Sequence, residues 1–171
     1  MRRLLFPILF LAGLGPAIAG ETGKITVQEA QQLSTALRNL DGHMVVVKQN
    51  GTDNVIMQPW EFGSGSLRLR IANDIAIVDH SMKLIEEARV GLVKEGLKKV
   101  KARTGEDATD MKPGTPEYDE FQKQYADLIA QPAPGTQDLA RIKASELKLD
   151  KNEIPGTVLT SLGPILDNDV K

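Results

Sequence analysis

Residues 67–92 read LRLRIANDIAIVDHSMKLIEEARVGL, and their apolar spacing predicts the architecture around them. The apolar side chains recur at intervals of four, three, four, three and seven residues, at Ile71, Ile75, Val78, Met82, Ile85 and Leu92. This heptad-like pattern is typical of a long helix that packs lengthwise against partner helices. We expect the helix to span residues 67–103, with a bend or break at Gly91 or Gly96, because glycine weakens a helix interior.

A second amphipathic helix is predicted upstream. Thr26 and Glu29 have the spacing of a capping box, in which each side chain accepts a hydrogen bond from the backbone N–H of the other residue. One apolar stripe follows at helical spacing, formed by Ala30, Leu33, Leu37 and Leu40. Asp41-Gly42 should end this helix, with Gly42 in the left-handed conformation that favours glycine.

Between the two helices the sequence predicts a β-hairpin. Residues 44–49 and 55–57 are rich in Val, Ile and Met, and Asn50-Gly51 lies between them. Asn-Gly favours a type I′ turn, because both central residues of that turn need positive φ. Two strands alone are marginally stable, so we expect the hairpin to pack on the helices, with Trp60 and Phe62 covering its open end.

A further helix is predicted to begin at Thr115-Pro116, where Thr caps and Pro occupies the first turn, and to end before Pro132. Its stripe is interpreted as core and consists of Tyr118, Phe121, Tyr125 and Leu128. The C-terminal tail is expected to hold one short strand, a turn and a final helix that Gly163-Pro164 interrupts. The predicted fold is therefore helix-dominated α+β, with a long central helix packed against shorter helices and one β-hairpin.

Residues 1–19 have the layout of a secretory signal peptide. Arg2-Arg3 is followed by an almost wholly apolar run over residues 4–14 and by the small-residue cleavage pattern Ala17-Ile18-Ala19. The run is shorter than the ~20 residues that span a bilayer. We predict removal of this leader, one helix-rich α+β domain over residues 20–171, no membrane contact after processing, and a periplasmic or secreted location. An upstream-extended start codon is the alternative, and it would leave the protein in the cytoplasm.

Composition excludes several classes of function. The 171 residues include no Cys, which rules out a disulfide scaffold, a thiolate nucleophile and a Cys-ligated metal. Lys and Arg number 21 against 23 Asp and Glu, a balance that argues against a general nucleic-acid binder. A basic run near the end of the long helix is interpreted as a solvated face, and it contains Lys94, Lys98, Lys99, Lys101 and Arg103.

The sequence predicts no catalytic residue, metal site or cofactor. Asp79-His80-Ser81 has the letters of a catalytic triad, but adjacent helical residues point about 100° apart and cannot form a relay. We interpret His80 as a solvent-side helix residue and His43 as a partner for a helix C-terminus. The protein is therefore expected not to be an enzyme. An exported periplasmic hydrolase, with a site assembled from distant residues, remains the alternative.

One segment could bind an anion. Ser64 and Ser66 lie in a Gly-Ser run that leads into the long helix, where backbone N–H groups can bind phosphate, and Arg68 and Arg70 follow directly. The run lacks the Lys-Ser/Thr of a P-loop. A linker with Ser66 as helix cap is the simpler interpretation, and a site for a phosphorylated small molecule on these four residues is the alternative.

Four blocks of the chain together resemble a group of small phage- and prophage-encoded proteins of unassigned function. The blocks are ITVQEAQQLSTALRNLDG, LRLRIANDIAIVDHSMKLIEEARVGLVKEGL, PGTPEYDEFQKQYADLIA and DLARIKASELKLDKNEIPGTVLTSLGPIL. The resemblance implies a phage or prophage origin and a non-enzymatic role in particle assembly or in countering a host factor. Such proteins usually act in the host cytoplasm and carry no export leader.

The primary hypothesis is a binding or assembly protein that acts through protein–protein contacts of its long amphipathic helix, either with a protein partner or by self-association. The heptad-like seam motivates it, because such a seam can exceed what one partner helix buries. The alternative is a protein that sequesters a phosphorylated small molecule, such as a host-defence signal.

Overall fold

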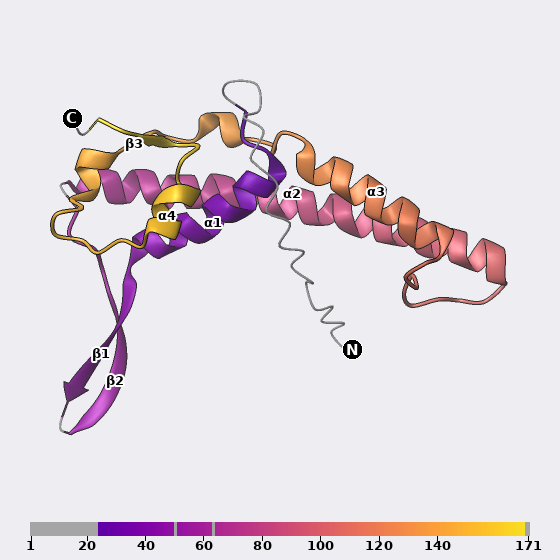
Figure 1. The fold of residues 1–171 in the computed structure, drawn as a ribbon, viewed down its shortest axis with the longest axis horizontal. Coiled ribbons are helices and arrows are strands. Elements are labelled where there is room, and N and C mark those ends of the chain that lie inside the picture. Colours follow the sequence, from indigo (N-terminus) through magenta and orange to yellow (C-terminus); the bar gives the residue numbers. More distant parts are fainter. Residues whose placement is uncertain (1–23, 50, 63, 170–171) are drawn as a thin grey trace.

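The computed structural model describes residues 24–49, 51–62 and 64–169, and its fold is helix-dominated α+β, as predicted (Figure 1). The predicted leader and Asn50 of the hairpin turn lie outside the described residues. The main elements are α1 (Val27–Asp41), β1 (His43–Gln49), β2 (Thr52–Gln58), α2 (Gly65–Thr104), α3 (Pro116–Ala130) and α4 (Gly156–Ser161). Short pieces complete the C-terminal segment: η1 (Thr136–Asp138), β3 (Ile142–Lys143), η2 (Ala144–Leu147) and β4 (Leu166–Asp167). Within these residues, no helix combines the length and apolarity that crossing a membrane requires.

The central helix α2 is 40 residues long and runs unbroken through both of its interior glycines. Its cap is Ser64, whose Oγ accepts a hydrogen bond from the Leu67 N–H at 3.4 Å, so the prediction of Ser66 as cap is wrong. The predicted break is also wrong. At Gly96 the Met111 side chain of the following loop lies so close that a β-carbon would overlap its Sδ. Glycine at this position permits the close approach of Met111.

The buried stripe of α2 shares Ile71, Val78 and Ile85 with the predicted seam, but Asp74 and Ser81 take the places predicted for Ile75 and Met82. Its members recur at spacings of four and three residues, and they are Leu67, Ile71, Asp74, Val78, Ser81 and Ile85. Ile75 and Met82 flank this stripe and are half-buried. The prediction passed over Asp74 and Ser81 because polar side chains rarely occupy a helix seam. Helix α1 packs along the first part of α2 and α3 along the last part (Figure 1).

Helix α1 supplies the largest share of the core. The predicted capping box is confirmed: the Glu29 N–H donates to Thr26 Oγ1 at 3.2 Å, and the Thr26 N–H donates to Glu29 Oε2 at 2.8 Å. Its buried side chains are Val27, Ala30, Leu33, Ala36, Leu37 and Leu40. The left-handed conformation expected of Gly42 is wrong, because its backbone is extended with φ 169°. A β-carbon at Gly42 would lie 3.0 Å from the Gln58 carbonyl oxygen, so the glycine permits a close approach of β2.

The hairpin forms between the predicted strands but without the predicted packing. Strands β1 and β2 pair antiparallel from His43↔Gln58 to Gln49↔Thr52, and Gly51 has the positive φ of 81° that the turn needs. We expected the strands to lie on the helices, but the hairpin projects away from the helical body (Figure 1). The apolar faces of α1 and α2 pack mainly against each other and against the C-terminal segment rather than against the strands.

Helix α3 has its predicted bounds, but its aromatic stripe is not core. Tyr118, Phe121 and Tyr125 are half-buried, whereas Glu117 on the same helix is buried. Thr115 precedes α3 without a side-chain capping bond, since its Oγ1 donates to the Lys112 carbonyl at 2.7 Å.

The C-terminal segment returns over α1 and the first part of α2. Its buried apolar side chains join the core there, and they include Ile142, Leu147, Val158, Leu162 and Ile165. Helix α4 spans only six residues. The predicted final helix does not resume after Gly163-Pro164, because β4 follows and pairs parallel with β3.

Candidate functional site

The exposed apolar surface of this protein is concentrated on the hairpin. Among the described residues, eight large apolar side chains are exposed, and five of them lie on β1 and β2. Their exposed fractions are 71% for Met44, 66% for Val46, 62% for Val55, 45% for Ile56 and 62% for Met57. Soluble monomers rarely expose contiguous apolar patches, and a large one marks an interaction site. The hairpin is therefore the candidate functional site.

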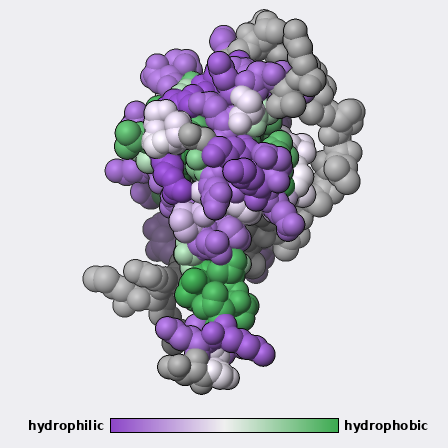
Figure 2. All heavy atoms as spheres, turned by 90° about the vertical axis from the view of Figure 1, so that its left-hand side faces the viewer, coloured by the Kyte–Doolittle hydropathy of each residue, from purple (hydrophilic) through white to green (hydrophobic). Residues whose placement is uncertain are grey.

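Four of these side chains share one face of the hairpin, which we call the Met–Val face. Met44 pairs with Met57 and Val46 pairs with Val55, and residues two apart on a strand point to the same side. The next pair on this face toward the turn is Lys48 opposite Asp53. Figure 2 shows the hydrophobic band on the hairpin, between the body and a hydrophilic tip.

The base of the hairpin is fixed to the body by Trp60. This residue is buried, its ring stacks on His43 with centroids 3.9 Å apart, and its Nε1 donates to the Asn39 carbonyl at 2.7 Å. Arg68 donates to the Trp60 carbonyl at 2.6 Å. Trp60 thus covers the open end of the hairpin, as expected, and holds that end against α1 and α2. His43 takes part in this contact by stacking on Trp60.

Asn152 clamps the chain just after β2, and sequence reasoning missed it. Its Oδ1 accepts from the Glu61 N–H at 3.1 Å, and its Nδ2 donates to the Glu61 carbonyl at 3.1 Å and the Leu147 carbonyl at 2.7 Å. The Asp150–Glu153 run superficially resembles a calcium loop, but Asn152 is buried and its amide is fully used here. The sequence signal was weak, a polar side chain two residues before the apolar Ile154.

The residues of the predicted anion site are partly brought together. The hydroxyls of Ser64 and Ser66 lie 2.9 Å apart at the start of α2. Both arginines, however, have partners within the chain. Arg68 is bonded to the Trp60 carbonyl, and Arg70 donates to the Arg141 carbonyl at 2.9 Å and forms an ion pair with Glu146. Their observed role is to fasten neighbouring segments to α2.

The three consecutive residues that spell a triad lie in three different environments, as their helical spacing predicts. Asp79 pairs with Arg38 at 2.6 Å on the surface, and His80 is exposed. Ser81 is buried in the seam, and no partner for its Oγ occurs within the described ranges.

Asp74 is the buried carboxylate of the seam and was not singled out from the sequence. Its side chain is 1% exposed, and Oδ1 accepts a hydrogen bond from the Ala140 N–H at 2.9 Å. Oδ2 is buried and lacks a partner in the described part of the chain. Burial raises the pKa of Asp74, and the Ala140 hydrogen bond and the nearby Arg70 charge offset only part of that rise.

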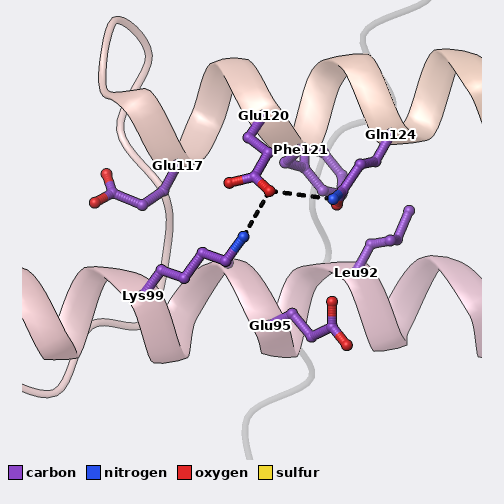
Figure 3. A pocket seen from close by; sticks show the side chains of 8 residues that line it. Leu92, Glu95, Lys99, Glu117, Glu120, Phe121 and Gln124 are labelled. Atoms are coloured by element: carbon purple, nitrogen blue, oxygen red, sulfur yellow. Dashed lines mark hydrogen bonds and ion pairs between the residues drawn. The ribbon is translucent and has the colours of Figure 1, made fainter.

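The crevice between α2 and α3 is closed by polar contacts (Figure 3). Lys99 Nζ lies 2.6 Å from Glu120 Oε1, which also accepts from the Gln124 amide at 3.2 Å. Leu92 and Phe121 contribute apolar lining, and the crevice has no room for a water molecule. It therefore offers no space for a ligand.

The basic run at the end of α2 is exposed, as predicted, and part of it is paired within the chain. Lys101 pairs with Asp107, and Arg103 pairs with the buried Glu117, each at 2.7 Å. The Arg103 hydrogen bond lowers the pKa of Glu117. These pairs join α2 to the loop and helix that follow it.

A second hollow, of about 420 Å³, is open to solvent where the start of α1 meets the C-terminal segment. Its lining includes Lys24, Glu29, Gln137 and Arg141, and Arg141 donates to the Pro164 carbonyl at 3.0 Å. Because this lining mixes basic and acidic side chains, the hollow does not favour an anionic ligand over a cationic one. Within the described residues, no group of three or more His, Asp or Glu side chains is placed to hold a metal ion.

Comparison with known proteins adds no template for this geometry: no family model, curated protein or solved structure matches the chain.

Proposed function

We propose that this protein is a small, non-enzymatic binding or assembly protein that acts through protein–protein contacts made by the β1–β2 hairpin. The observation that carries the proposal is the Met–Val face, four large apolar side chains that are each more than 60% exposed on a projecting arm. Leaving such a face in water costs roughly 25 cal/mol for each Å² of apolar surface, and a partner that covers it recovers that free energy.

The contact surface in this proposal differs from the one suggested by the apolar pattern of the long helix. The apolar side chains Ile71, Val78 and Ile85 are buried inside the chain, where α1 packs against α2. Further along, α3 covers α2. Since these side chains already have partners, the hairpin is the better-supported contact surface.

The tip of the hairpin favours a protein partner over a lipid surface. Lys48, Gln49, Thr52 and Asp53 are all exposed near the turn, beyond the apolar band. Insertion into a bilayer tip-first would carry two charged side chains into hydrocarbon, which is costly. A protein that contacts the Met–Val face from the side covers the apolar band and leaves the charges in water.

Site-specific photocrosslinking in the producing cell tests the proposal. A photoreactive amino acid is placed at Met44, on the Met–Val face, and separately at Leu69, which is 74% exposed on α2 and serves as the matched control. We expect a discrete protein adduct from position 44 that disappears when Val46→Ser and Val55→Ser are added. No adduct from position 44, or the same adduct from position 69, contradicts the proposal.

The alternative role, sequestering a phosphorylated small molecule, is less well supported. Arg68 and Arg70 already bond within the chain, so a phosphate would have to displace the Trp60 carbonyl or Glu146. Stabilisation by a phosphorylated compound in a thermal-shift screen, abolished by Arg70→Ala, would favour this alternative.

We also propose that the protein acts outside the cytoplasm, after removal of residues 1–19. Mass spectrometry of the native product tests this directly. A chain that begins at Gly20 supports export, and a chain that begins at any other residue contradicts the proposed removal of residues 1–19.

A further inference from the structure

We propose that the occupant of the Met–Val face is a second copy of this chain, packed face to face; this rests on the hairpin being the contact surface. The pairing across the two strands motivates the inference. Met44 lies opposite Met57, and Val46 lies opposite Val55, so the apolar side chains match from strand to strand. Exchanging β1 and β2 leaves the apolar pattern of this face unchanged.

A two-fold dimer needs a surface of this kind. In such a contact the same patch is used by both copies, so the patch must be complementary to itself. Rotation by 180° about an axis parallel to the strands, lying between two facing hairpins, places β1 of one copy over β2 of the other. Met44 then faces Met57 of the second copy, and Val46 faces Val55 of the second copy.

The charged pair next to the turn selects this axis over others. Lys48 and Asp53 are opposite each other on the same face and both are exposed. The rotation places Lys48 over Asp53 of the second copy and Asp53 over Lys48 of the second copy, which gives two ion pairs between chains. A two-fold axis that runs across the strands would instead place these charges over the Met44 end of the face. Opposite charges across an interface fix its register in this way.

The arrangement also suits the shape of the protein. A two-stranded hairpin alone is marginally stable in water, whereas two facing hairpins form a four-stranded sandwich with layers about 10 Å apart and eight apolar side chains between them. In Figure 1 α2 runs across the direction of the hairpin. Rotation about the hairpin axis therefore turns the two α2 helices to opposite sides of the dimer.

Charge exchange between two variants tests the inference. In a dimer of Lys48→Glu two carboxylates face each other at each charged contact, and in a dimer of Asp53→Lys two ammonium groups do. We expect each variant alone to dimerise about tenfold more weakly than the wild type, because two attractive pairs become repulsive. A mixture of the two restores both pairs between chains, so we expect a mixed dimer as tight as the wild type. Pairing within one chain cannot produce this rescue.

The measurement is sedimentation velocity of the purified chains between about 1 μM and 1 mM, with thermal unfolding as a control for intact folding. A wild-type chain that stays monomeric throughout overturns the inference, as does a dimer that neither variant weakens or that mixing fails to restore. If the chain is monomeric and position 44 still crosslinks to a different protein, the partner is not a second copy of this chain, but the proposed function stands.

Discussion

Single polar side chains do much of the positioning in this protein. Asp74 ties α2 to the chain before β3, Asn152 ties the C-terminal segment to the exit of the hairpin, and Trp60 fixes the base of the hairpin. Most buried polar groups in native proteins are hydrogen-bonded. Asp74 meets this condition with one carboxylate oxygen and Asn152 with its whole amide, so the two sites should respond differently to substitution.

Replacing Asp74 with Asn should stabilise the protein at neutral pH, by about 1 kcal/mol. Asn keeps the acceptor for the Ala140 N–H and removes a charge that burial disfavours. Because the pKa of Asp74 is raised in the folded state, the folded chain holds a proton that the unfolded chain has released between the two pKa values. The free energy of unfolding of the wild type therefore falls as pH rises through that window.

The advantage of Asp74→Asn should accordingly shrink as pH is lowered toward the usual range of an Asp carboxyl. Urea unfolding at several pH values measures it. Asp79→Asn is the matched control, because Asp79 is exposed on the same helix and its pair with Arg38 should contribute under about 1 kcal/mol. An advantage that grows on acidification contradicts the role assigned to the buried carboxylate.

Replacing Asn152 with Ala should destabilise the protein by about 2–3 kcal/mol, because the substitution removes the partners of Glu61 and Leu147 backbone groups. Thermal unfolding detects the loss. Glu153→Ala, at the exposed neighbouring residue, should change stability little. Equal melting temperatures for the two variants would show that the amide does not act as a clamp.

Local rules predicted most of the helices and strands correctly. The capping box at Thr26 and the start of α3 at Pro116 each depend on a few neighbouring residues and were predicted correctly, as was the position of the hairpin between its two strands, although Thr115 forms no side-chain cap. The seam of α2 was predicted correctly at Ile71, Val78 and Ile85 but wrongly at two positions, because the buried residues there are the polar Asp74 and Ser81. Strands β3 and β4 pair through residues far apart in the chain, Ile142 and Leu166, and no local sequence pattern predicts this pairing.

The two interior glycines of α2 give a matched test of how this helix is built. A β-carbon at Gly91 meets nothing within 4 Å, so Gly91→Ala should stabilise the protein by about 0.5–1 kcal/mol through helix propensity. Gly96→Ala gains the same propensity but must displace Met111. We expect it to be less stable than Gly91→Ala by about 1 kcal/mol. Equal effects in chemical denaturation would show that Met111 does not pack on Gly96.

The architecture as a whole combines a packed helical body with a projecting hairpin that is held at its base by Trp60 and whose Met–Val face is exposed. Helices α1 and α3 cover α2 in turn, and the C-terminal segment closes the core over α1. The apolar content of the hairpin was visible in the sequence, but its projection was not, because that depends on which helix faces are already covered. The proposed contact surface therefore depends on how the rest of the chain packs.

The most direct test of this account compares the mass in solution of three proteins by sedimentation velocity: the wild type, the Val46→Ser/Val55→Ser variant and the Leu69→Ser control. Removing two exposed apolar side chains from the hairpin leaves the core intact, so the monomers of all three proteins should unfold at nearly the same temperature at concentrations too low for dimers. We predict that the wild type and Leu69→Ser associate into dimers and that the double variant is monomeric. Identical sedimentation of all three proteins would contradict the account.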